Sequence, residues 1–220
     1  MFPEIISPQI LALIGQATLD TLQMVAVAAG LGTVLGLPLG VFLATSKRGE
    51  LFAAPLVNTL LGTLVNATRS TPFIILVVAI IPFTRLIAGT SIGTQAAIVP
   101  LTVAATPFIA RLIEGAIREV DQGLVEAARS MGATPLQIVR KVLVPEALPA
   151  IALGLTLAFS AMVGAVGGGG LGDLGIRYGY QRFMPEVMAA VVAVLIVLVQ
   201  TVQTIGDHLA RRLNKRLRHA

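Results

Sequence analysis

Few side chains in this sequence could carry out chemistry. There is no cysteine, and the two histidines, His208 and His219, both lie near the C-terminus. These counts exclude disulfides, thiolate nucleophiles and iron–sulfur clusters, and they argue against a metal site. Lys47, Lys141 and Lys215 all stand outside any glycine-rich loop that could cradle a phosphate. We therefore expect no catalytic residue, no metal and no cofactor bound by this chain.

Charges of both signs alternate with apolar residues in segment 121–145, which predicts two short helices. Asp121 is a suitable N-cap for a first helix over about 122–131, and Gly132 suits the left-handed residue that ends it. One face of this helix carries small and apolar side chains flanked by charge: Leu124, Ala127, Ala128 and Met131, with Glu126 and Arg129. The face could insert into a groove on another protein, or it could lie against the chain's own membrane helices or the lipid headgroups.

The second helix of this segment has a stronger start signal. Thr134 is its cap, Pro135 its first residue, and Gln137 stands three residues after the cap, which is the pattern of a capping box. Pro145 should end the helix. The two helices and the glycine turn between them predict a compact projection rather than a flexible linker.

The composition is that of an integral membrane protein. Hydrophobic residues make up 55% of the 220 residues, 12% are charged, and the mean hydropathy is +0.88. A soluble domain has about 25% charged residues. Because a bilayer span needs about 20 apolar residues, the uncharged stretches predict five spans. They cover about 18–44, 55–82, 92–112, 147–166 and 187–206, with 1–16 as a short external segment. We predict an all-α polytopic protein with a single transmembrane domain over 1–220.

Basic residues concentrate on one side of these spans. Twelve of the sixteen follow the first span, lie between the third and fourth, or follow the fifth: Lys47, Arg48, Arg111, Arg118, Arg129, Arg140, Lys141, Arg211, Arg212, Lys215, Arg216 and Arg218. The positive-inside rule then places the N-terminus outside and the basic tail 207–220 in the cytoplasm. The net charge of +5 is interpreted as attraction to anionic lipid rather than to nucleic acid.

Three features within the spans and loops carry further predictions. The first span repeats a small residue at every fourth position, which predicts a close helix–helix contact: Ala28, Gly32, Gly36, Gly40 and Ala44. The second span carries Asn66, Arg69 and Ser70, which either line a water-filled path or form polar contacts between helices, with Arg69 capped by carbonyls that Pro72 frees. A short turn is expected around 81–91, and the seven glycines of 167–179 predict a flexible external loop.

The polar segment also resembles a known signature. Glu126-Ala127-Ala128, then Gly132, then Val142 to Pro145 follow the EAA motif of bacterial ABC importer permeases, EAA-x3-G-x9-I-x-L-P, with valine at 142 and 144 in place of isoleucine and leucine. Four stretches are similar to the methionine-importer permeases, a five-span group of the type I importers: 69–73, 81–85, 89–93 and 131–135. The resemblance therefore covers nearly the whole chain.

This resemblance implies the type I ABC importer permease fold in the bacterial cytoplasmic membrane. The implied complex has two copies of this chain, two ATP-binding subunits that hold ATP and Mg²⁺, and an external substrate-binding lipoprotein. The EAA segment would couple the chain to the ATPase through Glu126, Ala127, Ala128, Arg129, Met131, Gly132, Ala133, Thr134, Pro135, Val142, Val144 and Pro145. The transport path would be lined by the spans, with Met162 near its gate.

The expected function is ATP-driven import of methionine, as the L and D forms and close analogues, by a subunit that is not itself an enzyme. Three alternatives remain open. The same architecture could import another small amino acid or a peptide. The chain could be a secondary transporter or channel that needs no ATPase, although it has neither an inverted hydropathy repeat nor a set of acidic residues inside its spans. It could also be an inert membrane scaffold.

Overall fold

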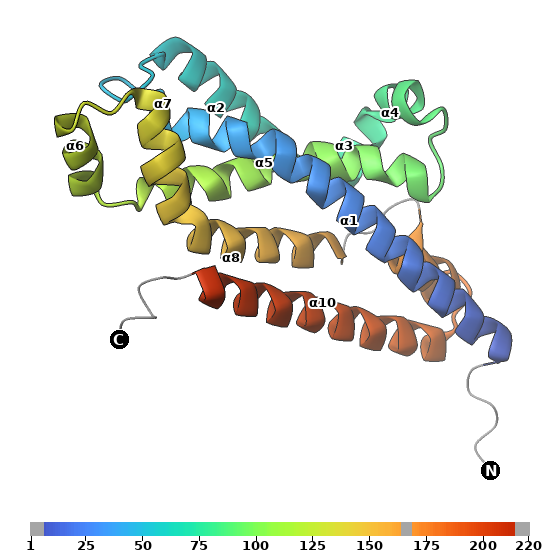
Figure 1. Ribbon diagram of the computed structural model, residues 1–220. Coiled ribbons are helices and arrows are strands. Elements are labelled where there is room, and N and C mark those ends of the chain that lie inside the picture. Colours follow the sequence, from blue (N-terminus) through green and yellow to red (C-terminus); the bar gives the residue numbers. More distant parts are fainter. Residues whose placement is uncertain (1–6, 164–168, 214–220) are drawn as a thin grey trace.

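The computed structural model describes residues 7–163 and 169–213, which form an all-α bundle (Figure 1). In this described part, four helical runs are long and apolar enough to cross a bilayer: α1 (Pro8–Thr45), α5 (Thr94–Arg118), the run that ends in α8 (Val144–Val163), and α10 (Pro185–Leu213). The bent pair α2 (Pro55–Ser70) and α3 (Phe73–Ala79) is the candidate for a fifth crossing when its two helices are counted as one broken span. The helices α6 and α7 lie at one end of the bundle, and α1 and α10 both begin at the opposite end (Figure 1).

Among the described residues, α1 and α5 make the most extensive helix–helix contact. The predicted stripe of small residues is confirmed, because every member is buried: Ala28, Gly32, Gly36, Gly40 and Ala44. A Cβ atom added to Gly40 would lie 2.5 Å from the carbonyl oxygen of Ala110, and one added to Gly36 would lie 3.0 Å from that of Thr106. Only glycine lets the two backbones approach this closely, so the stripe sets the distance between the helices.

The first helix is longer than expected. It begins at Pro8 rather than near residue 18, and the Ser7 side chain caps it by accepting a hydrogen bond from the N–H of Ile10 at 3.4 Å. Residues 8–16, which the sequence predicted as part of a short external segment, are the first turns of this helix, and residues 1–6 lie outside the described part. Proline in the first turn needs no N–H partner, which favours a start at this position.

The predicted second span, 55–82, is broken. The helix α2 ends at Ser70, Thr71 adopts an extended conformation (φ −80°, ψ 124°), and α3 leaves at an angle of 108°. Pro72 causes this break, because proline disfavours helical geometry in the residue before it and supplies no N–H of its own. The turn expected around 81–91 is largely helix, since α4 covers Ile81–Ala88 and ends at the left-handed Gly89 (φ 72°).

The glycine-rich stretch is also more ordered than predicted. From Gly170 onward it forms the short helix α9 (Gly170–Leu174) and a π-helix, η2 (Gly175–Tyr180), whereas 164–168 lie outside the described residues. The fully buried Leu171 donates its N–H to the Thr21 hydroxyl at 2.8 Å. A Cβ atom at Gly179 would lie 2.8 Å from that of Met188 on α10. The later glycines therefore permit close packing rather than flexibility.

Candidate functional site

The polar segment folds as a capped elbow, here defined as residues 121–138. Its first helix, α6 (Gln122–Ser130), begins at Asp121, whose carboxylate accepts a hydrogen bond from the N–H of Gly123 at 2.7 Å. After α6 the chain turns at Gly132, which has the left-handed φ of 76°. Both predictions are confirmed. The open space around Gly132 means that its backbone conformation, rather than crowding, requires glycine there.

The second helix of the elbow, α7 (Pro135–Ile138), has the predicted capping box. The hydroxyl of Thr134 accepts from the N–H of Gln137 at 3.4 Å, and the Gln137 side chain accepts from the N–H of Thr134 at 2.9 Å. Two backbone N–H groups that would otherwise lack partners are thereby satisfied. The elbow is fixed at its turn by two independent local signals.

The expected stop at Pro145 is wrong. The helix continues from α7 through a π-helical turn, η1 (Val139–Leu143), directly into α8. In that turn the N–H of Val144 bonds to the carbonyl of Val139, five residues earlier. The π turn shifts the hydrogen-bond register just before Pro145, so the missing proline N–H falls at a junction where it can be accommodated. The elbow is consequently joined to a membrane helix without a loop.

The face predicted for partner contact is divided in the structure. Ala128 is only 4% exposed and packs with Val125 in the main hydrophobic cluster, so it supports the elbow from within. Leu124 is 41% exposed, Met131 81% and Leu136 58%. These last three are the large exposed apolar side chains of the elbow, and they are here called its apolar surface.

The other residues of the EAA motif and the segment after it fall into two groups. Exposed positions around the apolar surface, and one at the start of α8, are Glu126, Ala127, Arg129, Gly132, Thr134, Pro135 and Pro145. Half-buried positions that support it are Ala133, Val142 and Val144. The motif therefore supplies exposed residues for contact with a partner and half-buried residues that pack beneath them.

A charged cavity of about 320 Å³ separates α6 from the α1–α2 loop and the end of α5. Arg48 and Glu50 come from the loop, Arg118 from α5, and Glu126 and Arg129 from α6. The elbow thus stands away from the bundle on this side, and it is anchored through α5 and α8 at its two ends.

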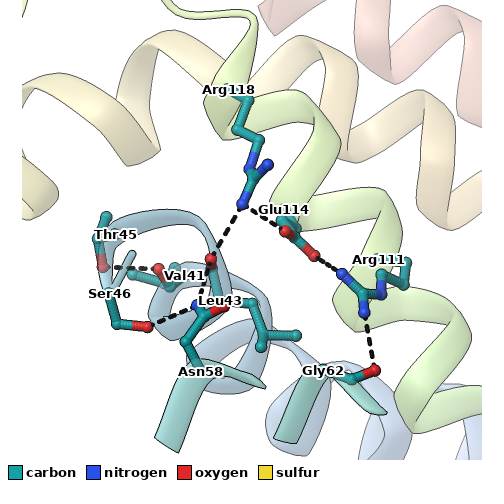
Figure 2. A network of polar contacts seen from close by, with 9 residues as sticks. All are labelled: Val41, Leu43, Thr45, Ser46, Asn58, Gly62, Arg111, Glu114 and Arg118. Atoms are coloured by element: carbon teal, nitrogen blue, oxygen red, sulfur yellow. Dashed lines mark hydrogen bonds and ion pairs between the residues drawn. The ribbon is translucent and has the colours of Figure 1, made fainter. Parts of the chain in front are cut away.

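A cluster of charges around the buried Glu114 ties the base of the elbow to three membrane helices (Figure 2). Glu114, 6% exposed, forms ion pairs with Arg111 and with Arg118, the second at 2.7 Å. Each arginine also donates to a carbonyl of another helix: Arg111 to Gly62 of α2 at 2.9 Å and Arg118 to Leu43 of α1 at 3.3 Å. The cluster joins α5, α1 and α2 immediately before the chain enters α6.

Asn58 extends this cluster. Its amide donates to the Leu43 carbonyl at 2.9 Å and to the hydroxyl of the fully buried Ser46 at 2.8 Å (Figure 2). Sequence reasoning missed Glu114, Asn58 and Ser46, and treated the arginines only as markers of orientation. The spacing Arg-x-x-Glu-x-x-x-Arg, which places all three side chains on one helix face, was the available signal.

The polar residues predicted to line a path are only partly brought together. Arg69 and Met162 line one cavity of about 490 Å³ between α2, α3, α5 and α8. The guanidinium carbon of Arg69 lies 5.8 Å from the ring centre of Phe108. Asn66 and Ser70 do not line this cavity, and the Ser70 hydroxyl donates to the Asn66 carbonyl within α2.

The sequence also matches the family of binding-protein-dependent transport system inner membrane components over residues 36–219. The chain belongs to that family. It is therefore a multi-pass membrane permease of the type I importer fold. The chain is 58% identical over 206 residues to the probable D-methionine transport system permease MetI of Vibrio cholerae, covering 91% of this chain and 92% of that one.

A second relative and two solved structures are similar to this permease over most of its length. It is 46% identical over 216 residues to the probable D-methionine permease MetI of Pasteurella multocida, covering 96% of this chain and all of that one. A chain from an inward-facing structure of the MetNI methionine ABC transporter superimposes with a TM-score of 0.92 at 47% identity, covering 96% of this chain and 100% of that chain. An amino acid ABC transporter crystallised with histidines matches with a TM-score of 0.73 at 21% identity, covering 92% of this chain and 94% of that one, which supports the fold alone.

Proposed function

We propose that this permease is the membrane subunit of an ATP-driven importer of methionine, as the L and D forms and close analogues. The observation that carries the proposal is the capped elbow, whose exposed Leu124, Met131 and Leu136 project from a rigid base. The names of the Vibrio and Pasteurella relatives support methionine as the cargo.

The elbow is the surface that a separate ATPase subunit contacts. Large exposed apolar side chains together with the exposed charges of Glu126 and Arg129 make the elbow a suitable insert for a groove on another protein. The sequence has no phosphate-binding GxxxxGK[ST] motif, so ATP and Mg²⁺ belong to that partner. The working complex contains two permeases, two ATPase subunits and an external substrate-binding lipoprotein.

The elbow end of the bundle faces the bacterial cytoplasm in this proposal. Basic residues gather at that end, at Lys47 and Arg48 after α1 and at Arg211 and Arg212 in the last turn of α10. The positive-inside rule supports this orientation. The opposite end, where α1 and α10 begin, then meets the external binding protein.

The charge cluster around Glu114 transmits movement of the elbow to the bundle. Closure of two ATPase subunits would displace α6, which follows α5 after only a short turn. Because Glu114 and its two arginines join α5 to α1 and α2, those helices would move as one body. Rocking of such bodies opens the path to one side of the membrane and then to the other. Arg69 and Met162 belong to the wall of that path, with Asn66 and Ser70 nearby on α2.

Uptake of labelled methionine tests this proposal. Cells that lack their own methionine importer should regain uptake when this chain is expressed with its ATPase and binding protein, and should lose it when the phosphate-binding lysine of the ATPase is replaced. Uptake that persists without ATP hydrolysis would identify a secondary transporter. Restored uptake of a different solute alone would reject methionine.

A further inference from the structure

The cavity beside the α2–α3 bend has the size and lining of a small-molecule site. Its volume of about 490 Å³ lies within the range of about 300–1,000 Å³ typical of ligand pockets. Most of its wall is apolar, from Phe73, Leu101, Phe108 and Met162, and its charged member is Arg69. A mostly apolar pocket with one well-placed charge binds molecules that have one apolar end and one anionic end.

Arg69 is held where it can receive an anion. It occupies the last turn of α2, where the partial negative charge of the helix end favours a cation. Its guanidinium lies over the Phe108 ring, which orients it without using its N–H donors. An arginine within a membrane-crossing segment needs compensation, and a carboxylate that accepts hydrogen bonds from two parallel N–H groups of the guanidinium provides it.

The break in the second crossing opens this position. Pro72 ends α2 two residues after Ser70, and α3 turns away by 108°. Interrupted helices are a recurrent way to expose polar groups to a substrate inside a membrane protein. The hydroxyls of Thr68 and Thr71, which also line the cavity, donate to their own helix at 3.0 Å and retain lone pairs that can accept from an ammonium group.

The apolar wall suits a flexible thioether side chain. The rings of Phe73 and Phe108 and the side chain of Met162 provide polarisable surface, and sulfur makes favourable contacts with aromatic rings. A zwitterionic amino acid with an unbranched apolar side chain would therefore match the charged, hydroxyl-bearing and apolar parts of the cavity together.

We propose that this cavity is a binding site within the membrane for the transported amino acid, with the Arg69 guanidinium holding the α-carboxylate and the wall of Phe73, Leu101, Phe108 and Met162 holding the side chain. The inference rests on the proposed function for the identity of the cargo. The inference adds a defined substrate-binding site on the transport path. Coupling of the elbow to an ATPase does not by itself require such a site.

Competition binding tests the carboxylate contact directly. The permease–ATPase complex, purified in lipid nanodiscs without the external binding protein, is titrated with labelled methionine and then with methioninamide, which lacks the anionic carboxylate. The wild type should bind methionine at least tenfold more tightly, a difference of about 1.4 kcal/mol. Arg69→Gln should abolish this preference while leaving the affinity for methioninamide within about twofold. Arg69→Lys should retain part of it, because lysine keeps the charge but not the bidentate geometry.

A matched control comes from Arg85 on α4, which hydrogen-bonds Ser91 and lies outside the cavity lining. Arg85→Gln should keep the full preference for methionine. Equal binding of methionine and methioninamide by the wild type, or an unchanged preference in Arg69→Gln, overturns the inference. If the Arg69→Gln complex does not assemble, the Arg69→Lys complex serves as the test. A preference of Arg69→Lys for methionine over methioninamide equal to that of the wild type would then overturn the inference.

The two proposals fail in different experiments. Cells that take up methionine through the complex, combined with a purified complex that shows no carboxylate preference, would reject the intramembrane site and leave the proposed function standing. Cells that take up another solute instead would reject the proposed function itself.

Discussion

Neutralising Glu114 should weaken the bundle more than any neutralisation of a surface carboxylate. In Glu114→Gln the shape is nearly kept, but the half-buried Arg111 and the partly exposed Arg118 lose their shared counter-charge. Removing one partner of a buried ion pair costs about 3–5 kcal/mol. Since Arg118 is 37% exposed and glutamine can still accept one hydrogen bond, we expect about 2–3 kcal/mol.

The assay is thermal unfolding of the purified complex in detergent. For a domain of this size a loss of about 2–3 kcal/mol corresponds to a fall in Tm of about 5–10 °C. The matched control is Glu119→Gln, an exposed carboxylate one turn further along the same region, which should change stability by no more than about 0.5 kcal/mol. A Tm for Glu114→Gln within about 1 °C of the wild type would refute the assignment of Glu114 as the centre of the cluster.

A replacement of the whole cluster separates its roles. In Arg111→Met, Glu114→Leu and Arg118→Met combined, no buried charge is left unpaired, so much of the lost stability should return. The hydrogen bonds from α5 to the carbonyls of Gly62 and Leu43 would nevertheless be absent. Methionine uptake should therefore stay low in the triple variant even where Tm recovers, and full recovery of both would show that the cluster serves stability alone.

Two glycines give further predictions. Gly132→Val should reduce methionine uptake at least tenfold without reducing the amount of permease in the membrane, because a β-branched residue is strained at φ 76°. Gly132→Asn should keep most of the uptake, since asparagine tolerates a left-handed conformation. Uptake by the valine variant equal to that of the wild type would show that no left-handed residue is needed at this turn. Gly40→Val should lower the yield of folded protein and its Tm, because the added Cβ would lie 2.5 Å from the Ala110 carbonyl oxygen. Gly30→Val is the control, since Gly30 has open space around it, and it should lower neither quantity. Equal Tm values for the two variants would contradict the packing of α1 on α5.

Local signals predicted local structure well. The cap at Asp121, the left-handed Gly132 and the Thr134–Gln137 box each depend on a few neighbouring residues, and all are present. The stripe of small residues in α1 was also predictable, because residues four positions apart lie on the same face of a helix. In each case the information lies within a turn or two of the chain.

Features that depend on tertiary context were not predicted. Pro145 and Pro72 are both prolines next to apolar helical sequence, yet one is absorbed by a π turn and the other produces a sharp bend. The glycines after Gly170 give the composition of a flexible loop, but the surfaces of α1 and α10 decide that they pack closely. Sequence left open whether the face that carries Ala128 meets a partner or the chain's own helices, and the structure buries Ala128 in the main hydrophobic cluster.

The central claim is that the exposed surface of the elbow receives force from an ATPase subunit, and site-directed crosslinking tests it most directly. Because the chain has no native cysteine, a single cysteine carrying a photo-crosslinker can be placed at Met131, which is 81% exposed, or at Ala128, which is 4% exposed. In native membranes the probe at Met131 should trap the ATPase subunit and the probe at Ala128 should not. Failure of the Met131 probe to trap that subunit, in a complex that still takes up methionine, would contradict the account.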